Sequence, residues 1–404
     1  MLIHKYLIMR QGFLRSSVLV FVFLVFTFVI ASSFIFPHIF RASYSSDTLL
    51  EEKIASSSPS FVVTHIDTPE PLKAIYMTAC VAGVKSLRDS LKSFVENTEL
   101  NAIVIDVKDY SGTVSILGEG LQEGDATGCK VPDLKEFIGE LHKSDIYTIA
   151  RVTVFQDPYY TKLHPELAVR SKSTGGVWKD RKGLAFIDVG AKDYWDYIIK
   201  LSKVSYDIGF DEVNFDYIRY PTDGDMKDAH YSLTVGTSTR SEMLESFFSY
   251  LHKNLKDVGV KTSADLFGLT TLASDDMGIG QVLEKALPYF DFIYPMVYPS
   301  HYAWNTGGFG DPATHPYEIV KYSMDSALLK EQAYRIALGL STSTPSQIRP
   351  WLQDFDLGAD YDTLKIQAQI KATYDSGVTG WLMWDASNKY TREAYLPAQT
   401  GLQE

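Results

Sequence analysis

The chain of 404 residues has little of what holds small disulfide-rich folds together or binds transition metals. Its two cysteines, Cys80 and Cys129, are too few for a disulfide framework or for a zinc site made of thiolates. They should lie at the same end of the fold, either bridged in an oxidising compartment or as free thiols. The nine histidines form neither a His-x-His pair nor a His-Glu-x-x-His motif. We therefore predict no metal and no other cofactor.

Other functional signatures are missing as well. The net charge is −12 and no basic stripe is present, which argues against nucleic acid as a partner. No Gly-x-Ser-x-Gly nucleophile elbow occurs. The turn after the first expected strand, residues 78–83, is not a glycine-rich phosphate turn. No repeat of fixed period suggests a solenoid or propeller. The sequence indicates no protein partner either.

The N-terminus carries the clearest targeting signal. Lys5, Arg10 and Arg15 precede an uncharged apolar run close to the roughly 20 residues that cross a bilayer. We predict a cytoplasmic basic N-terminus at 1–17 and a transmembrane signal-anchor at 18–40, with the remainder outside the cytoplasm. Cleavage of a signal peptide near Ala31 is the alternative. A Ser-rich linker at 41–71 then leads to the soluble body at 72–404.

The soluble body alternates strand-like apolar runs with amphipathic helical stretches. This alternation predicts parallel βαβ units, and the number of units favours an α/β fold of the (β/α)8 TIM barrel type over a doubly wound open sheet. The expected strands are 72–80, 102–107, 146–155, 210–221, 260–267, 290–297, 334–340 and 378–384. The expected helices are 84–97, 133–144, 193–208, 242–258, 280–287, 317–330 and 363–376, with a weak signal for a short helix after Thr391.

The run from Phe210 to Pro221 combines a buried strand pattern with chemistry. Val213, Phe215 and Tyr217 share one parity and suit packing against helices, whereas Asp216 lies on the other face near the strand end. Catalytic residues of such barrels lie at the carboxyl ends of the strands. A structural pair between Asp216 and Arg219 at the barrel rim is the alternative interpretation.

Several further acids and cations fall at predicted strand ends, and they indicate a polar barrel mouth. Several converging carboxylates are what glycoside hydrolysis needs, because one protonates the leaving oxygen and another attacks the anomeric carbon or activates water. Two simpler roles stay open, an ion pair of Asp106 with Lys108 and a capping role for Asp265. The residues that we expect at the mouth with Asp216 are Asp106, Asp109, Arg151, Arg219, Asp265 and Asp385.

Aromatic side chains frame the same end. Tyr298, His301 and Trp384 follow or end predicted strands, and apolar sugar faces stack on such rings. We predict that Tyr298 and Trp384 lie near the cleft. Some of the remaining tyrosines and tryptophans would face the helices whatever the function.

Three of these segments resemble the putative glycosyl hydrolase domain family, a barrel family of mostly uncharacterised bacterial proteins that are often anchored or secreted. The segments are 104–112, 214–221 and 380–388, and the resemblance spans about 73–388. In many related barrel glycosidases the nucleophile ends strand four, which implies this role for Asp216. The acid lies on strand five or six, and the sixth strand here has no carboxylate at its end, so the resemblance favours Asp265.

The sequence thus predicts a membrane-anchored, extracytoplasmic glycoside hydrolase of a cell-envelope or exported polysaccharide. Asp216 is the expected nucleophile or charge stabiliser, and Asp265 the general acid/base. Asp106, Asp109, Arg151, Arg219 and Asp385 would orient the substrate and tune pKa values. The alternative is a non-catalytic glycan-binding barrel of the cell envelope, with carboxylates that do not flank one bond. A hydrolase of an ester or amide is a third possibility, for which we find no nucleophile and base.

Overall fold

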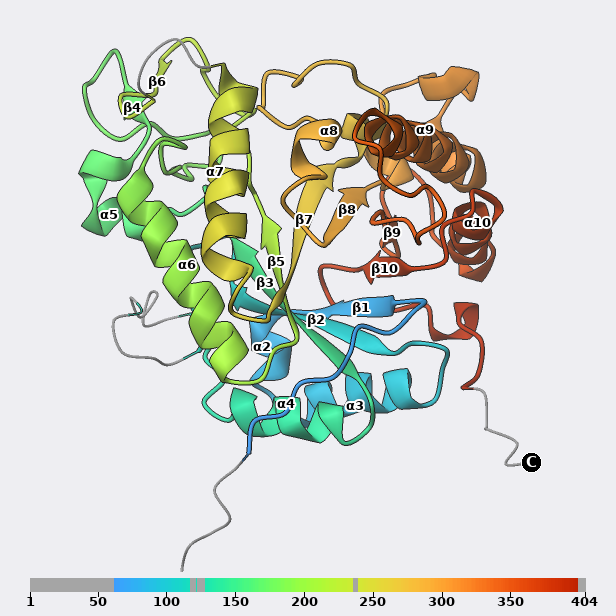
Figure 1. Ribbon diagram of the computed structural model, residues 1–404. Helices are drawn as coiled ribbons and strands as arrows, with labels where there is room; N and C mark the ends of the chain where they lie inside the picture. Colours follow the sequence, from blue (N-terminus) through green and yellow to red (C-terminus); the bar gives the residue numbers. More distant parts are fainter. Residues whose placement is uncertain (1–61, 117–120, 122–127, 235–238, 399–404) are drawn as a thin grey trace, which may run out of the picture. The chain divides into compact units, whose positions relative to one another are not determined.

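A computed structural model describes residues 62–116, 121, 128–234 and 239–398 (Figure 1). The predicted cytoplasmic N-terminus, the signal-anchor at 18–40 and most of the linker lie outside the described residues. Within the described residues, no helix has both the length and the apolar character needed to cross a membrane. The unit that contains the barrel begins at Val62.

Parallel strands close into a barrel in the order β1-β10-β9-β8-β7-β5-β3-β2. This confirms the predicted α/β barrel. Its strands read as apolar runs because both faces are covered, and all seven residues of β2 are buried. The barrel strands are β1 (Lys73–Met77), β2 (Ala102–Lys108), β3 (Tyr147–Thr153), β5 (Glu212–Asp216), β7 (Lys261–Phe267), β8 (Phe292–Met296), β9 (Trp351–Gln353) and β10 (Trp381–Trp384).

Helices surround the barrel in Figure 1 and cover the outer faces of its strands. Their starts follow local signals. At α7, Thr239 and Glu242 form a reciprocal capping box, and at α10 the Asp362 side chain accepts from the Lys365 amide. The helices are α2 (Ala79–Ala82), α3 (Lys85–Glu96), α4 (Leu134–His142), α5 (Tyr160–Leu163), α6 (Lys192–Asp207), α7 (Arg240–Leu255), α8 (Leu283–Ala286), α9 (Pro316–Ala337) and α10 (Thr363–Asp375).

The prediction for the seventh strand was wrong. Residues 334–340 do not form a strand, because α9 continues through Ala337 instead of ending near residue 330. The apolar side chains there do not mark a core, since Ile336 is 63% and Leu338 59% exposed. The seventh barrel strand is β9, and its three residues are too short to show a period.

The two faces of β5 serve different layers. Val213 and Phe215 pack in the large core cluster between barrel and helices, as predicted. Asn214 and Asp216 face the barrel interior, where they bond to residues of β3 and β7. The strand ends at Asp216, because Tyr217 adopts a left-handed backbone with φ 52°. Tyr217 therefore does not share the helix-facing side that its parity predicted.

The loops after β3 and β5 are tied together outside the barrel. The short strands β4 (Arg170–Ser171) and β6 (Ala229–His230) pair antiparallel. A small cluster that includes Trp178 and Phe186 packs beneath them. These loops carry part of the rim beside the candidate site.

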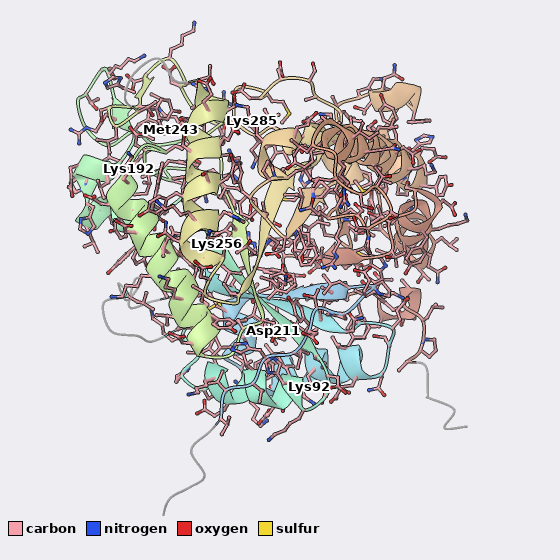
Figure 2. The ribbon with its side chains drawn as sticks, viewed as in Figure 1. Lys92, Lys192, Asp211, Met243, Lys256 and Lys285 are labelled. Carbon is pink, nitrogen blue, oxygen red and sulfur yellow. A yellow bond between two sulfur atoms is a disulfide. The ribbon has the colours of Figure 1, made fainter. Side chains whose placement is uncertain are left out.

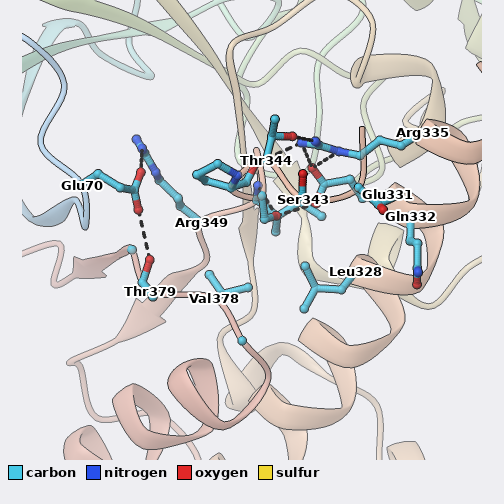
Figure 3. Close-up of a pocket in the computed structure, with 16 residues that line it drawn as sticks. Glu70, Leu328, Glu331, Gln332, Arg335, Ser343, Thr344, Arg349, Val378 and Thr379 are labelled. Atoms are coloured by element: carbon cyan, nitrogen blue, oxygen red, sulfur yellow. Dashed lines mark hydrogen bonds and ion pairs between the residues drawn. The ribbon is translucent and has the colours of Figure 1, made fainter. Parts of the chain in front are cut away.

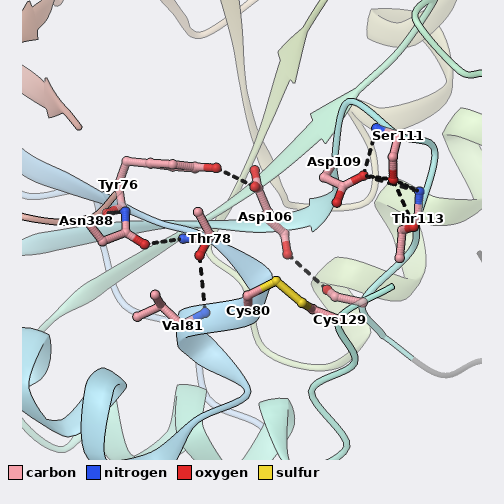
Figure 4. The surroundings of a disulfide bond; sticks show 11 residues. Tyr76, Thr78, Cys80, Val81, Asp106, Asp109, Ser111, Thr113, Cys129 and Asn388 are labelled. Atoms are coloured by element: carbon pink, nitrogen blue, oxygen red, sulfur yellow. Dashed lines mark hydrogen bonds between the residues drawn. A yellow bond between two sulfur atoms is a disulfide. The ribbon is translucent and has the colours of Figure 1, made fainter. Parts of the chain in front are cut away.

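Cys80 and Cys129 form a disulfide (Figure 4). Cys80 lies on α2, directly after β1, and Cys129 lies in the connection that follows β2. The bond therefore decides between the two alternatives that the sequence left open. It joins two connections at the same end of the barrel, close to Asp106 and Asp109 (Figure 4).

The opposite end of β5 also carries buried acids. Asp211, labelled in Figure 2, accepts from the Thr148 amide at 2.8 Å and faces His142 Nε2 at 2.9 Å. The Ile66 amide donates to its other oxygen at 2.8 Å, which fastens the segment before β1. Glu212 accepts from the hydroxyls of Tyr294 at 2.7 Å and Tyr147 at 3.2 Å. These bonds close the base of the barrel.

Candidate active site

Arg151 on β3 lies at the centre of the acidic cluster in the barrel mouth. It is 5% exposed and donates to Asp106 at 2.6 Å and, through Nη2, to Asp216. Its Nε lies 4.0 Å from an oxygen of Asp265. One guanidinium thus interacts with acids from β2, β5 and β7, and the rim pairs that the sequence left open as alternatives do not form. Asp216 pairs with Arg151 instead of Arg219.

Asp265 has the least exposed side chain of the three acids. Its side chain is 2% exposed, and one oxygen accepts from Asn214 Nδ2 at 2.9 Å and Trp351 Nε1 at 2.8 Å. Burial, and next the negative charge of Asp216, raise the pKa of Asp265 well above its ordinary value. Arg151 and the two hydrogen bonds oppose this rise without cancelling it. Burial and the charge of Asp216 therefore favour the protonated form of Asp265 more than in an ordinary aspartate.

Asp106 holds Arg151 from the side of β2. The Tyr76 hydroxyl and Arg151 both donate to its carboxylate. Burial raises the pKa of Asp106, although Arg151 and Tyr76 oppose the effect. Lys108 does not pair with it, because its ammonium lies 2.9 Å from Asp157 in the core. Asp106 thus acts on the site through Arg151.

Aromatic rings form one wall of the mouth. Tyr76 on β1 stacks on Trp384 at the end of β10, with ring centroids 3.9 Å apart. Trp351 on β9 meets Trp384 edge to face at 5.5 Å. The Arg151 guanidinium lies 5.0 Å from the Trp384 ring centroid. These contacts fix the cation and hold Trp384, which lines the cavity, while Tyr76 and Trp351 support it from within the core.

A cavity of about 430 Å³ opens onto this cluster. Tyr298 lies close enough to the acids that burial and the charges of Asp265 and Asp216 raise its pKa. His301 is partly desolvated, and burial lowers its pKa. The residues predicted for the site that line the cavity are Arg151, Asp216, Arg219, Asp265, Tyr298, His301 and Trp384.

Asp109 and Asp385 hold the loops at the same end of the barrel and do not line the cavity. Asp109 accepts from the amide and hydroxyl of Ser111 at 2.9 and 2.6 Å (Figure 4). Asp385 accepts from the amide and hydroxyl of Ser387 at 2.7 and 2.6 Å. Both carboxylates thus shape the turns that follow their strands.

Comparison with known proteins places the chain in a family. The model of a family described as a putative glycosyl hydrolase domain matches residues 74–390. The chain belongs to this family. No curated protein matches the sequence.

The barrel of this chain also resembles solved structures. The glycoside hydrolase domain of PgaB (BpsB) from Bordetella bronchiseptica has a TM-score of 0.57 at 12% identity, over 81% of this chain and 98% of that one. A hypothetical protein from Ruminiclostridium thermocellum ATCC 27405 is 29% identical, over 51% of this chain and 98% of its own, with a TM-score of 0.43. At its low identity, the likeness to the Bordetella domain supports the fold.

Three contributors to the glycosyl hydrolase-like site were not predicted. Asn214 shares the parity of Asp216, which was a usable signal, and its amide bonds to Asp265. Trp351 was missed along with β9. Tyr217 lines the cavity only because its backbone turns left-handed after Asp216, and no local pattern signals that turn.

A second cavity, of about 510 Å³, lies away from these acids, near the starts of β9 and β10 (Figure 3). Its charged groups are paired with one another, as Arg349 with Glu70 at 3.0 Å and Arg335 with Glu331 at 2.7 Å. Glu331 also accepts from the Gln347 amide at 2.9 Å. These pairings give its acids a structural role.

The part of the chain that the structure describes offers no metal centre. Within it, no group of three or more His, Cys, Asp or Glu side chains is arranged to hold a metal ion. At the mouth, the three acids surround the guanidinium of Arg151. The chemistry that these residues can perform themselves is proton transfer and stabilisation of a developing positive charge.

Proposed function

We propose that this protein hydrolyses glycosidic bonds of a polysaccharide by a two-carboxylate mechanism. One observation carries the proposal. Asp216 and Asp265 line the same cavity, but Arg151 neutralises Asp216, whereas burial and the charge of Asp216 raise the pKa of Asp265. An acid with a raised pKa, beside a second carboxylate that an arginine holds, is the arrangement that a glycosidase needs.

In this mechanism Asp265 donates its proton to the glycosidic oxygen as the bond to the leaving sugar breaks. Asp216 stabilises the positive charge that develops at the anomeric carbon, by attacking it or by activating a water molecule. Arg151 holds Asp216, and the Tyr217 amide donates to its other oxygen at 2.6 Å. Asp265 then serves as the base in the second half of a retaining reaction.

The aromatic wall would bind the sugar. Trp384 presents a ring to the cavity, and its stacking on Tyr76 fixes the orientation of that ring. Tyr298 and His301 line the same cavity and offer polar groups to sugar hydroxyls. Their edge-to-face contact, with centroids 5.4 Å apart, keeps these two rings together.

The experiment is to incubate the purified full-length protein with a panel of bacterial envelope and exported polysaccharides and to measure new reducing ends. Wild-type protein should release them from at least one polymer, and Asp216→Asn should lower the rate by at least about 10²-fold. Glu212→Gln is the matched control, because it changes an acid of the same strand that does not line the cavity. Unchanged cleavage by Asp216→Asn would refute the mechanism.

The alternative function, a non-catalytic glycan-binding barrel, predicts a different result in the same experiment. Wild-type protein would bind a polymer of the panel without releasing reducing ends, and Asp216→Asn would change binding alone. The convergence of Asp216 and Asp265 on one cavity, with the pKa of Asp265 raised, favours the enzyme, because glycosidic hydrolysis needs a proton donor beside a second carboxylate.

We also propose that residues 18–40 anchor the barrel in the cell membrane, with the barrel outside the cytoplasm. The proposal rests on the uncharged apolar run after Lys5, Arg10 and Arg15. The disulfide between Cys80 and Cys129 is consistent with an oxidising compartment. Alkaline phosphatase fused after residue 404 should be active in cells, and the protein should stay with membranes after a high-salt wash. An inactive fusion, or release into the medium, would contradict the proposal.

A further inference from the structure

Arg219 is a cation of the cavity that the proposed mechanism does not use. Its guanidinium lies 4.8 Å from the ring centroid of Phe267 and 5.3 Å from that of Tyr217. Nη1 donates to the Tyr220 carbonyl at 3.1 Å and lies 3.5 Å from the Thr222 hydroxyl. Among the residues that the structure describes, no carboxylate lies within 4.0 Å of it. Arg219 thus has spare N–H donors and no carboxylate at ion-pair distance, and the charges of Asp216 and Asp180 act on it only from farther away.

The other arginine of the cavity, Arg151, differs from Arg219 in its carboxyl partners. Arg151 has three acids within 4.0 Å, so its charge has carboxyl partners within the protein. Burial lowers the pKa of Arg219, because its positive charge is desolvated and nearby charges repay little of that cost. A bound anion would supply the neighbouring negative charge that the protein itself does not place beside Arg219.

The position of Arg219 suits contact with an extended ligand. Tyr217 and Arg219 line both the main cavity and a neighbouring cavity of about 440 Å³, so they stand at the junction of the two. Tyr110, which is 57% exposed, and Lys182 line the far side of the second cavity. A polymer that runs from the acids into this second cavity would pass Arg219.

Two acids of the second cavity are already engaged. Asp180 accepts from the amides of Lys182 at 2.9 Å and Leu184 at 2.8 Å, which fixes a tight turn. Asp223 lies 3.5 Å from Arg181 Nε. Their carboxylates leave the Arg219 guanidinium open to a ligand.

We propose that the substrate is an acidic glycan, and that Arg219 binds the carboxylate of a sugar residue at the junction of the two cavities. This inference rests on the proposed function and names the substrate class. The planar guanidinium can donate two parallel hydrogen bonds to a carboxylate, and the Tyr217 and Phe267 rings hold it in the orientation required. The neighbouring cavity takes the next sugars of the chain.

The test compares each acidic polymer with its own neutral form. Hyaluronan, alginate and polygalacturonate are used as such and after chemical reduction of their carboxyl groups, with the full-length protein. Wild-type protein should process or bind at least one acidic polymer at least about tenfold better than its carboxyl-reduced form, the gain expected from a charge-assisted hydrogen bond. Arg219→Gln and Arg219→Met should abolish that preference, and Arg219→Lys should keep part of it.

Arg240→Gln is the matched control. Arg240 also lies over two tyrosine rings, at 5.2 and 5.5 Å from their centroids, but lines neither cavity. Its replacement should leave the acid preference unchanged. Arg219→Met keeps the apolar stem, so it also serves if the glutamine variant unfolds.

The outcomes separate this inference from the proposed function. Acid preference that depends on Arg219, measured as binding without any cleavage, supports the inference and counts against the hydrolase. Cleavage of neutral polymers that equals or exceeds cleavage of acidic ones supports the hydrolase and overturns the inference. An equal loss on acidic and neutral polymers in Arg219→Met also overturns it, because Arg219 would then act on packing alone.

Discussion

Strand β5 has buried acids at both ends, and the two ends treat them differently. At its start, Glu212 accepts from two tyrosine hydroxyls, and the preceding Asp211 ties β3, α4 and the segment before β1 together. At its end, Asp216 shares one arginine with two other acids beside an open cavity. Arg151 Nε and Asn214 Oδ1 have no hydrogen-bond partner there.

The difference teaches how to separate structural from functional acids in one barrel. Buried polar groups that serve stability have their hydrogen bonds satisfied within the protein. Groups kept for a ligand retain unmet hydrogen-bonding capacity and face a cavity. By this criterion the acids at the base of β5 support the fold, and those at its mouth end are the candidates for chemistry.

The largest loss of activity is expected from a substitution of Asp265, the proposed general acid. Asp265→Asn should lower the rate of polysaccharide cleavage by about 10²–10⁴-fold, because the leaving oxygen then receives no proton. The loss should shrink greatly for aryl glycosides of the same sugar that carry a good leaving group. An equal loss on both substrate types would show that Asp265 serves structure instead of proton transfer.

A substitution at the base of the barrel should lower stability and leave catalysis nearly unchanged. Asp211→Asn should lower the free energy of unfolding by about 2–4 kcal/mol, because it disrupts a buried network that joins three segments. Its kcat per folded molecule should stay near wild type, as measured by urea unfolding and steady-state kinetics. Asp89→Asn on the exposed face of α3 is the control and should leave stability unchanged. A large loss of kcat in Asp211→Asn would break the contrast.

The pH dependence of kcat/KM should show whether Asp265 is the acid that titrates at the barrel mouth. Because Asp265 must be protonated to act, kcat/KM should be high below its pKa and fall as the pH rises through it. Trp351→Phe removes a hydrogen bond that favours the charged carboxylate, so the alkaline limb should move to higher pH. A limb that stays in place or moves to lower pH would argue against Asp265 as the titrating group.

The smallest effect is expected at the rim. Asp385→Asn should lower kcat by less than about tenfold, because the carboxylate bonds within its own loop and does not line the cavity. Asp109→Asn should also lower kcat by less than about tenfold, since the Asp109 carboxylate bonds only within its own turn. A loss as large as that of Asp265→Asn would return these acids to the catalytic set.

The fold and part of the site could be predicted because they depend on local pattern. Alternating runs gave the parallel barrel, and the acids at strand ends identified Asp216, Asp265 and Arg151 as neighbours. The choice of partner could not be predicted, because it depends on side-chain reach across the barrel. Arg219 lies only three residues after Asp216 in the sequence, yet Arg151 from the neighbouring strand makes the ion pair.

The remaining errors have specific physical causes. β9 bonds to its neighbours over so few residues that no period appears, and with it Trp351 was missed. The apolar residues at the end of α9 were interpreted as a buried strand, but they are exposed. Hydrophobic residues are common on protein surfaces, so an apolar run alone does not indicate burial.

The most direct test of the account is the pKa of Asp265, measured by ¹³C NMR on protein labelled at the aspartate carboxyl carbons and assigned with Asp265→Asn. The account predicts a carboxyl that titrates well above the ordinary aspartate range, and a lower value in Asp216→Asn, which removes the neighbouring charge. An Asp265 carboxyl that titrates at the ordinary value or below it, or one that does not respond to Asp216→Asn, would contradict the account.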